Sequence, residues 1–592
     1  MTAPRLDRSQ SDAAFVEPTT RQLVIAGPGS GKTEVVSNLV EHLVEEEGVD
    51  AADGILVISF SNAAVHAADA RLRARGAAPV VVQTMDSLAG EVIRDLADED
   101  IAGMGFDRRI KRATALLNNE PWDRLDNLQH LVVDEIQDVV GVRADFLLAI
   151  LKGLPDDAGF SLLGDPAQGI YDWQLRAANK PLSPTTSLAF LASVRAIPGV
   201  QVRELTGQYR ARSRDARTVV GLRDAALRGE PGSPLDEFFA GLVPAGDIES
   251  VVDHARRWAG TTVFLTDNNG QALLTAEAIA AAGEPVEVRR SAHQRILAQW
   301  IARVAADHPT TGITRDELEA RAVAVAPDRD PASLWRAFRS VTGGRGQEVS
   351  LPALARGLRR PRPLVPDLIE PMSARFIVST VHRAKGLEFD NVVRVEFPDK
   401  PWLQDDEPDD GEATRRLFVA LSRARDIIIR CDGPDDRHLR APGDGTDHWY
   451  LSGRQRWMKL GYQFTVTDLD RSEPPGEDKA ATQAYIAQTL SPGDVLRFEL
   501  DLTRTSLSFP AWNLFHDGHL VARTSREFGE GMARWLGPRD RANVPWPRIT
   551  GGRVESIATI SGDTQGGTVG RHGLWLSPIC AGMLRFDWSG ER

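Results

Sequence analysis

Short apolar runs alternate with glycine-rich and polar turns along the first half of the chain, and they predict buried strands. Residues 23–26 are apolar and lead through a glycine-rich turn into an amphipathic segment that reads as a helix. Residues 131–133 are also apolar and end directly at Asp134 and Glu135. Residues 261–283 read as another strand with its following helix. The repeated order of strand, turn and helix predicts an α/β fold.

The pattern between residues 291 and 370 is helical. Apolar residues that would share one helix face recur there at helical spacing, and they are Ile296, Leu297, Trp300, Ile301 and Val304. Thr314 and Glu317 have the spacing of a capping box, which predicts that a second helix begins there. The segment ends in a cluster of arginines that reads equally well as a phosphate contact or as a basic linker: Arg356, Arg359, Arg360 and Arg362.

Strict alternation replaces the helical pattern in the last part of the chain. Apolar residues occupy every second position of one predicted strand, at Leu496, Phe498, Leu500 and Leu502. The pair Asp517 and Gly518 has the composition of a two-residue hairpin turn. Residues 554–560 and 572–580 read as further short strands. We therefore expect residues 446–592 to form a small β-rich domain, whose role the sequence does not indicate.

Composition and charge restrict the class of protein. The 592 residues are 42% hydrophobic and 26% charged, which is ordinary for a globular protein. The formal net charge of −13 argues against a general nucleic-acid coat protein, which would be basic. Cys431 and Cys580 cannot form a disulfide framework, which fits a reducing compartment. The sequence shows neither the apolar core of a signal peptide nor a membrane-spanning run, so we expect a cytoplasmic protein without a membrane segment.

The turn after residue 26 has the composition of a phosphate-binding loop. Its backbone amides would surround phosphate oxygens at the start of a helix, and the residues concerned are Gly27, Gly29, Ser30 and Gly31. Lys32 would reach the β- and γ-phosphates, and Thr33 would ligate Mg²⁺.

The adjacent carboxylates Asp134 and Glu135 are explained by that loop. A buried, unpaired carboxylate is costly, so a positive group should meet them. Lys32 and a metal ion would supply this charge, with Asp134 holding Mg²⁺ beside Thr33 and Glu135 activating the attacking water. Two motifs about a hundred residues apart that complete one site predict a nucleotide triphosphatase with ATP and Mg²⁺ as cofactors.

The order of the remaining motifs indicates which kind of nucleotide triphosphatase this is. The carboxylates belong to "DEIQD" (134–138), and further motifs follow it in sequence: "LLGDPAQGIYDW" (162–173), "LTGQYRAR" (205–212), "VSTVHRAKGLEFDNVV" (378–393) and "RRLFVALSRAR" (415–425). With "LDRSQSDA" (6–13) at the start, this series resembles the UvrD/Rep/PcrA-like branch of superfamily-one DNA helicases. The resemblance covers about residues 5 to 430.

The resemblance implies roles for residues outside the phosphate loop. Gln10 would read the adenine edge, and Tyr209 would stack on the adenine. Gln168 would sense the γ-phosphate. Glu388 would bind the ribose. Two arginines would face the γ-phosphate, Arg210 and, as the arginine finger, Arg423.

A second set of residues would contact a nucleic-acid strand. The resemblance implies that Phe60 stacks on a base and that Thr84 and His382 contact the strand. Tyr171 and Trp173 are candidates for stacking on consecutive bases, a sequence-tolerant interaction. Without the resemblance, a place in the hydrophobic core is the alternative interpretation for Phe60, Trp173 and His382. Asp86 departs from the family's pattern and would repel a phosphate.

The motif positions predict two RecA-like P-loop lobes with a short helical insertion and a C-terminal β-rich domain. The first lobe would occupy 1–185, with a reduced insertion near 88–128. The second lobe would be built from 186–290 and 371–440, and 291–370 would be the helical insertion.

We therefore expect an ATP-dependent DNA helicase or translocase that moves on single-stranded DNA or on DNA with a single-stranded tail. The resemblance alone implies the 3′-to-5′ direction. A DNA-stimulated regulatory ATPase, which senses ends or single strands and acts with a partner such as a nuclease, is the alternative. The short insertions favour this alternative, because unwinding in the family relies partly on those domains. The sequence leaves DNA repair, recombination and defence against foreign DNA equally open.

Overall fold

The computed structural model describes most of the chain between residues 6 and 588. The residues outside the description within that span are 60–79, 98, 100, 102, 173, 176–182, 231, 290–295, 344–345, 361–363, 372–373, 399–409, 444, 456–457, 507–508, 538–545, 565–566 and 581. The chain divides into two compact units. The first contains Met1–Leu242, Lys385–Glu388 and Lys400–Ile428, and the second contains Val243–Ala384, Phe389–Asp399 and Ile429–Arg592.

The first unit is built on a parallel sheet of six strands in the order β3-β2-β4-β5-β1-β6. The strands are β1 (Arg21–Ala26), β2 (Ile55–Ser59), β3 (Val81–Thr84), β4 (His130–Val133), β5 (Gly159–Gly164) and β6 (Gln201–Leu205). Because all of them run in one direction, their carboxyl ends lie along one edge of the sheet, where ligands of such sheets bind. Strand β6 lies within the span predicted for the second lobe, yet it pairs with β1, so the first sheet extends beyond residue 185.

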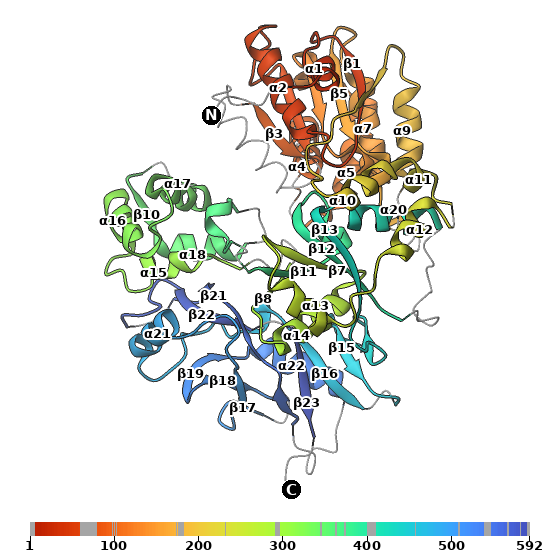
Figure 1. Ribbon diagram of the computed structural model, residues 1–592. Coiled ribbons are helices and arrows are strands. Elements are labelled where there is room, and N and C mark those ends of the chain that lie inside the picture. The colour runs from red at the N-terminus through yellow and green to blue at the C-terminus, as the bar shows by residue number, and fades with distance from the viewer. Residues whose placement is uncertain are drawn as a thin grey trace. The chain divides into compact units, whose positions relative to one another are not determined.

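Helices cover both faces of this sheet (Figure 1). Alternate strand residues such as Val24 and Val132 pack with α1 (Arg8–Ala14) and α2 (Lys32–Glu45). The intervening residues, such as Leu23 and Leu131, face the other core. That core is closed by α4 (Met85–Ala97), α5 (Phe106–Asn119), α6 (Asp123–Asp126), α7 (Val142–Gly153) and α9 (Ser187–Arg195). The two-sided cover explains why these strands read as continuous apolar runs.

The remaining elements of the first unit follow β6 or come from the later segment of the chain. They are α10 (Arg214–Gly221), α11 (Arg223–Arg228), α12 (Pro234–Gly241) and α20 (Asp410–Leu421). Strand β13 (Ala424–Asp432) begins in the first unit and ends in the second.

The second unit contains a second α/β sheet, in the order β13-β12-β7-β11-β8. Strands β7 (Thr262–Thr266), β8 (Val286–Val288), β11 (Phe376–Thr380) and β12 (Phe389–Glu396) run parallel. Helices α13 (Ile248–Ala255) and α14 (Asn269–Ala281) share a core with it. The predicted α/β fold with two RecA-like sheets is confirmed, and residues 261–283 form the expected strand and helix.

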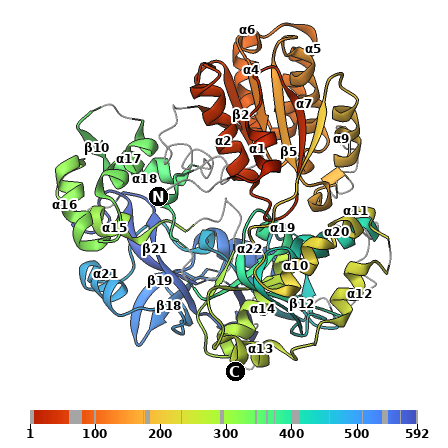
Figure 2. The same cartoon turned by 45° about the horizontal axis from the view of Figure 1, so that its top comes forward.

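A helical group follows β8, and Figure 2 shows its helices gathered together. It comprises α15 (Gln299–Ala305), α16 (Arg315–Val325), α17 (Pro331–Thr342) and α18 (Leu351–Arg359), with a small hairpin of β9 (Gly312–Thr314) and β10 (Glu348–Ser350). The predicted capping box at the start of α16 is present. The predicted helix face was wrong in part. Ile296 and Leu297 precede α15, and Leu297 forms isolated bridges with Ile369 and Thr559.

The C-terminal region is β-rich, as predicted, and its strands pair in antiparallel fashion. Its strands form three sheets, in the orders β14-β15-β16-β23-β20, β17-β18-β19 and β21-β22. They are β14 (Leu439–Arg440), β15 (Tyr450–Ser452), β16 (Lys459–Phe464), β17 (Arg497–Leu500), β18 (Trp512–His516), β19 (His519–Arg523), β20 (Arg548–Thr550), β21 (Val554–Ser561), β22 (Leu574–Cys580) and β23 (Gly582–Asp587). Helices α21 (Lys479–Gln488) and α22 (Arg526–Leu536) complete a shared aromatic core.

Two local predictions in this region have different outcomes. Asp517 and Gly518 both have positive φ, 45° and 81°, and join β18 to β19 as the expected hairpin turn. Leu502 does not continue the buried face, because β17 ends at Leu500 and Leu502 is 79% exposed. In the described part of the chain, none of the helices has the length and apolar character that a membrane crossing requires.

Candidate nucleotide site

The glycine-rich turn lies between β1 and the start of α2. Gly29 and Gly31 have φ values of 76° and 81°, which side chains other than glycine rarely adopt. A Cβ atom at Gly31 would lie 2.2 Å from the side-chain nitrogen of Gln10, and one at Gly29 would lie 2.5 Å from Cβ of Arg210. The turn therefore needs glycine both for its backbone and for the close approach of its neighbours.

Lys32, at the first position of α2, lies between the two carboxylates that follow β4. Its Nζ is 2.9 Å from Asp134 Oδ1 and 2.5 Å from Glu135 Oε1. Burial opposes the lysine charge, but the two carboxylates outweigh it and raise the pKa of Lys32. Burial raises the pKa of Asp134. For Glu135 the effect of burial is outweighed by Lys32 and Lys385, which hold its pKa below the usual range. Lys32 therefore supplies the positive charge that the sequence predicts beside Asp134 and Glu135.

The backbone fixes the direction of the Glu135 side chain. Its φ is 57°, a left-handed conformation that is uncommon outside glycine. The backbone nitrogen of Glu135 donates to Asp134 Oδ1 over 2.9 Å, and the Gln137 amide donates to Glu135 Oε2. Gln137 in turn accepts a 3.0 Å hydrogen bond from the backbone of Asp165, at the end of β5. Residues held in such a conformation cluster at functional sites.

Lys385 is a member of the site that the sequence reasoning missed. Its Nζ contacts the Asp138 carboxylate and donates to the carbonyl oxygen of Gln168 over 2.5 Å. It also lies 5.2 Å from the centre of the Tyr171 ring. Burial raises the pKa of Asp138 to about 7, against the opposing effect of Lys385. Lys385 stands three residues before Glu388 in a motif already assigned to the nucleotide, and that position was the available signal.

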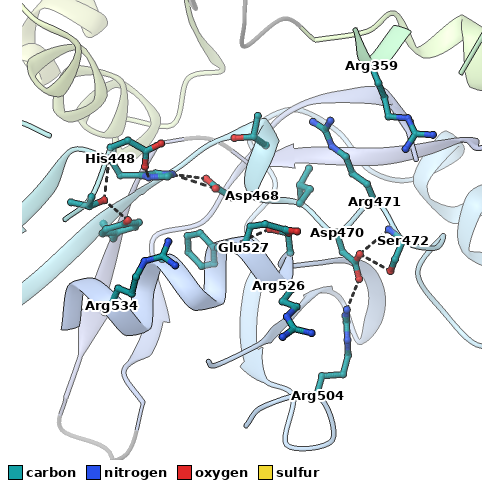
Figure 3. Close-up of a pocket in the computed structure, with 18 of the residues that line it drawn as sticks. Arg359, His448, Asp468, Asp470, Arg471, Ser472, Arg504, Arg526, Glu527 and Arg534 are labelled. Atoms are coloured by element: carbon teal, nitrogen blue, oxygen red, sulfur yellow. Dashed lines mark hydrogen bonds and ion pairs between the residues drawn. The ribbon is translucent and has the colours of Figure 1, made fainter. Parts of the chain in front are cut away.

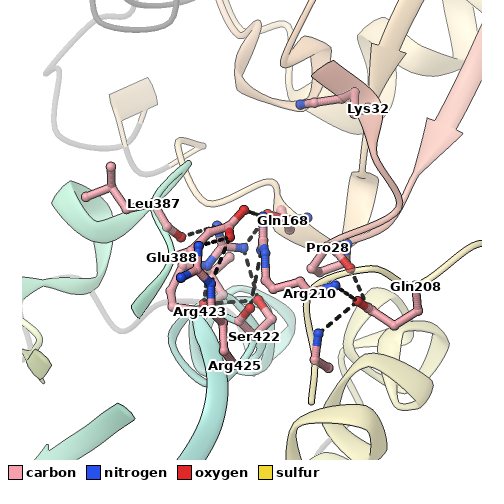
Figure 4. Close-up of polar contacts among 12 residues, drawn as sticks. Pro28, Lys32, Gln168, Gln208, Arg210, Leu387, Glu388, Ser422, Arg423 and Arg425 are labelled. Carbon is pink, nitrogen blue, oxygen red and sulfur yellow. Dashed lines mark hydrogen bonds and ion pairs between the residues drawn. The ribbon is translucent and has the colours of Figure 1, made fainter. Parts of the chain in front are cut away.

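Gln168 connects the turn after β5 to α20. Its amide nitrogen donates to Asp165 Oδ2 over 2.8 Å, and its oxygen accepts a 2.7 Å hydrogen bond from Arg423 (Figure 4). Arg423 is 1% exposed and also donates to the carbonyl of Val419. Burial, together with the charge of Arg210, lowers the pKa of Arg423 to about 9. A buried arginine in this position is costly unless an anion meets it.

Arg210 is the second arginine beside Gln168 in Figure 4. It donates to Glu388 Oε1 over 2.9 Å, and Arg425 binds the other oxygen of Glu388 over 2.8 Å. Burial opposes ionisation of Glu388, but these two arginines outweigh it and lower its pKa. Glu388, predicted at the ribose, thus holds Arg210 in place in this structure.

Tyr209 and Gln10 flank the phosphate loop. Gln10 is buried, completes a capping box with Asp7, and donates to the carbonyl of Ser30 over 3.0 Å. The Tyr209 side chain is 59% exposed, and its hydroxyl donates to Asp7 over 2.6 Å. This bond raises the pKa of Tyr209 to about 12, so the ring stays neutral. An exposed aromatic ring fixed at one edge beside the loop can serve as a stacking surface.

Atoms without partners show that this site fits a phosphate ligand. Ser30 Oγ and Arg210 Nε are buried and have no hydrogen-bond partner among the residues that the structure describes. Both belong to the groups around the loop, where phosphate oxygens would accept their hydrogen bonds. A preformed cluster of three or more His, Cys, Asp or Glu is absent from the described residues.

The predicted strand contacts are only partly described. Phe60 and Trp173 lie outside the described residues. Thr84 is buried at the end of β3, and its hydroxyl donates to Ser87 over 3.1 Å. Tyr171 is partly buried beside Lys385. His382 lies in the second unit, in the short helix α19 (Val381–Ala384).

Asp86, which departs from the expected pattern, is neutralised by its surroundings. Arg143 of α7 donates to Asp86 over 3.2 Å and to Asp107 over 3.1 Å. The guanidinium of Arg143 therefore offsets the repulsion that Asp86 alone would exert on a phosphate. Neither Arg143 nor this compensation was identified from the sequence.

Comparison with known proteins gives two family matches. Residues 6–102 match the UvrD/REP helicase N-terminal domain, and residues 375–427 match the UvrD-like helicase C-terminal domain. The first segment contains Gln10 and the phosphate loop, and the second contains Lys385, Glu388 and Arg423. No match is found among the curated proteins.

Solved structures are similar only in a general way. S. cerevisiae Dbp5 bound to RNA and ADP BeF3 aligns with a TM-score of 0.34 at 11% identity, over 72% of this chain and 84% of that one. A point variant of the same protein in the same complex gives a TM-score of 0.34 at 12% identity, with the same coverage. The two family matches lie on the segments that build the nucleotide site, so this chain carries UvrD/Rep-like helicase domains and is a helicase ATPase.

Proposed function

We propose that the protein is an ATP-dependent motor that moves along single-stranded DNA in the 3′-to-5′ direction. One observation carries the proposal. Lys385 and Arg423, which lie far from Gln168 in the sequence, both donate hydrogen bonds to it, and Lys385 also binds the Asp138 carboxylate. Arg210 lies beside them, where it donates to the carbonyl of Ser422 and to Glu388. Such a site responds to the presence or absence of a γ-phosphate, because the phosphate would share the arginines with Gln168 and Glu388. Polarity and the preference for DNA rest on the resemblance in the sequence motifs.

The proposed roles follow the positions of the side chains. Thr33 and Asp134 would hold Mg²⁺, which would neutralise phosphate charge when bound. Lys32 would leave the carboxylates for the β- and γ-phosphates, which frees Glu135 to accept a proton from the attacking water. The arginines Arg210 and Arg423 would stabilise charge on the γ-phosphate.

The base and ribose of ATP would be held by residues next to the loop. Gln10, fixed by Asp7 and by the Ser30 carbonyl, would present its amide to the adenine edge. Tyr209 would stack on the ring. Glu388 would exchange one of its arginine partners for the ribose when Arg210 turns to the phosphate.

Hydrolysis can be coupled to the strand through one short segment. Gln168 and Tyr171 are three residues apart, and Lys385 contacts both the Gln168 carbonyl and the Tyr171 ring. A change in the partners of Gln168 on loss of the γ-phosphate would therefore alter the position of Lys385 and Tyr171. Such a change beside a stacking residue provides one step of movement per ATP.

A regulatory ATPase that senses DNA ends or single strands, and acts with a partner such as a nuclease, is the second candidate. The observation that favours it is the short connection between Ser87 and Asp134. Helices α4 and α5 of this connection pack into the core of the first sheet, with Leu88 and Ile110 fully buried. The connection thus supplies core helices and leaves little chain for a separate unwinding domain.

Strand displacement by the purified protein tests the proposal. Duplexes with a 3′ tail, a 5′ tail or blunt ends are compared in the presence of ATP, alongside ATP turnover with and without single-stranded DNA. A motor of the proposed direction displaces the 3′-tailed strand, and Glu135→Gln abolishes displacement. Strong DNA-stimulated turnover without displacement or translocation supports the regulatory ATPase. Turnover that does not respond to DNA contradicts both candidates.

A further inference from the structure

A cavity lies in the second unit, and none of its lining residues belongs to the helicase motifs. It has a volume of about 750 Å³, within the range of small-ligand sites. Its lining contains as many arginines as carboxylates, and the arginines come from separate elements: Arg359 of α18, Arg471 and Arg504 of loops, and Arg526 and Arg534 of α22. Such convergence requires the packing of the helical group against the β-rich region within the second unit.

Two of these arginines lack a carboxylate partner among the described residues. Arg534 makes no ion pair there. Arg471 donates only a long 3.4 Å hydrogen bond to the carbonyl of Val466, and its Nε is buried without a partner. The other three arginines have partners in Asp563, Asp470 and Glu530.

The position of Arg471 is electrostatically unfavourable in the absence of an anion. Figure 3 shows its guanidinium next to that of Arg359, with Arg534 on the other side of the drawn residues. Burial first, and then the charge of Arg359, lower the pKa of Arg471, although Asp468 and Glu527 act in the opposite direction. Two neighbouring guanidinium groups and a buried unpaired donor describe a site that an anion would complete.

Most carboxylates of the lining are paired with other residues of the lining. Asp468 accepts hydrogen bonds from Thr465 and is paired with His448, which also binds Asp447. Asp470 binds Arg504 and Ser472. Asp563 is paired with Arg359, and Glu527 is exposed. The carboxylates therefore leave Arg471 and Arg534 available for a ligand.

We propose that this cavity binds a phosphate-bearing ligand, with Arg471 and Arg534 as its principal contacts and Arg359 as a third. Guanidinium groups match phosphate oxygens in geometry and keep their charge at neutral pH. The ligand is the phosphate of a nucleic-acid end or that of a free nucleotide, since both present the same group. The site is independent of the proposed motor activity, because none of its residues belongs to the nucleotide site.

The test uses the full chain with Lys32→Ala and Glu135→Gln. The first change removes the main phosphate contact of the nucleotide site, and the second removes one of the carboxylates that would otherwise lose its counter-charge. Tripolyphosphate is the probe, and its affinity is measured by calorimetry. We expect it to bind this protein, and Arg471→Gln or Arg534→Gln to weaken binding by about tenfold each. Arg548→Gln, which removes an equally exposed arginine of β20 outside the cavity, is the matched control and should leave the affinity unchanged.

Two competition experiments distinguish a nucleic-acid end from a free nucleotide as the ligand. Displacement of tripolyphosphate by a 5′-phosphorylated oligonucleotide, and not by its 5′-hydroxyl counterpart, identifies a nucleic-acid end as the source. Displacement by ADP and not by the oligonucleotide identifies a free nucleotide. Absence of binding, or equal affinity in the Arg534→Gln and Arg548→Gln proteins, overturns the proposal. Arg534 is exposed, so its substitution keeps the test valid even if Arg471→Gln impairs folding, as circular dichroism would show.

Discussion

Arg423 and Gln168 are 255 residues apart in the chain, and the guanidinium of Arg423 donates a 2.7 Å hydrogen bond to the Gln168 side-chain oxygen. Arg423 is almost completely buried, so this bond and the carbonyl of Val419 hold its charge in a fixed position. The arrangement places a preorganised arginine next to the residue assigned as the γ-phosphate sensor. Preorganised charge of this kind accounts for much of the rate enhancement in phosphoryl transfer.

Arg423→Gln should lower ATP turnover by about 1000-fold, because the substitution removes charge stabilisation in the transition state. ATP binding, measured with a fluorescent nucleotide, should weaken far less. Arg228→Gln, on an exposed position of α11 in the same unit, is the matched control. Equal loss of binding and turnover would show that Arg423 only supports the fold.

Glu135→Gln should abolish hydrolysis while ATP still binds, because the amide keeps the shape of the side chain but cannot accept a proton. Filter binding and a phosphate-release assay separate the two effects. Hydrolysis at the wild-type rate by this variant would contradict the assignment of Glu135 as the base.

Lys32→Ala should weaken ATP binding and lower the free energy of unfolding. The substitution leaves the buried carboxylates of Asp134 and Glu135 without their counter-charge, a situation that costs about 3–5 kcal/mol for a buried pair. Adding Glu135→Gln to Lys32→Ala should recover part of the lost free energy of unfolding. Denaturant titration measures both variants, and additive losses in the double variant would contradict the coupling.

Lys385→Met should destabilise the first unit by about 3 kcal/mol, since it leaves the Asp138 carboxylate buried and unpaired. Asp138→Asn in the same background should restore part of this stability. Because Lys385 also contacts the Gln168 carbonyl, the DNA stimulation of turnover should fall more than the DNA-free turnover. Lys111→Met, at an exposed position of α5, serves as the control in denaturant and turnover measurements.

Arg143→Gln should weaken single-strand binding by about fivefold, because it exposes the negative charge of Asp86 in the first turn of α4. Asp86→Asn in that background should restore binding, since no charge remains to repel a phosphate. Fluorescence anisotropy with a labelled oligonucleotide measures this cycle. If Asp86→Asn has no effect in the Arg143→Gln protein, Asp86 does not face the strand.

His130 gives the first unit a pH-dependent stability. Its ring is fully buried in β4, bonded to the Pro18 carbonyl and to Ser161, and burial lowers its pKa to about 4. The unfolded state binds the proton near pH 6.5 and the folded state only near pH 4, so stability is lost as the pH falls between these values. From about pH 7.5 to about pH 4.5 the loss is about 2.5 kcal/mol.

Unfolding curves at the two pH values check this contribution. His130→Asn should be less stable than the wild type near pH 7.5, because it loses hydrogen bonds, but the gap should close by about 2.5 kcal/mol near pH 4.5. His254→Gln, at an exposed position of α13, should show no such change. A gap that is the same at both pH values would contradict the titration of His130.

The sequence by itself determined the features that depend on neighbouring residues. The glycines of the phosphate loop, the carboxylates after β4, the capping box at Thr314 and the turn at Asp517 and Gly518 were all predictable. Each is set by backbone preference, or by the period of apolar residues over a few positions. The repeated order of strand, turn and helix predicted the α/β fold, which the two sheets confirm. The family resemblance added the roles of the later motifs.

The tertiary structure alone decided which distant side chains meet. The contact of Lys385 with Asp138 spans 247 residues, and the pairing of Arg143 of α7 with Asp86 of α4 depends on how the two helices lie in their shared core. Leu297 precedes its helix because its backbone bridges Thr559 in a strand more than 260 residues later, which no local period can indicate. The arginine cavity is of the same kind. Its charges come from elements that are separate in sequence, and only packing of the folded chain brings them together.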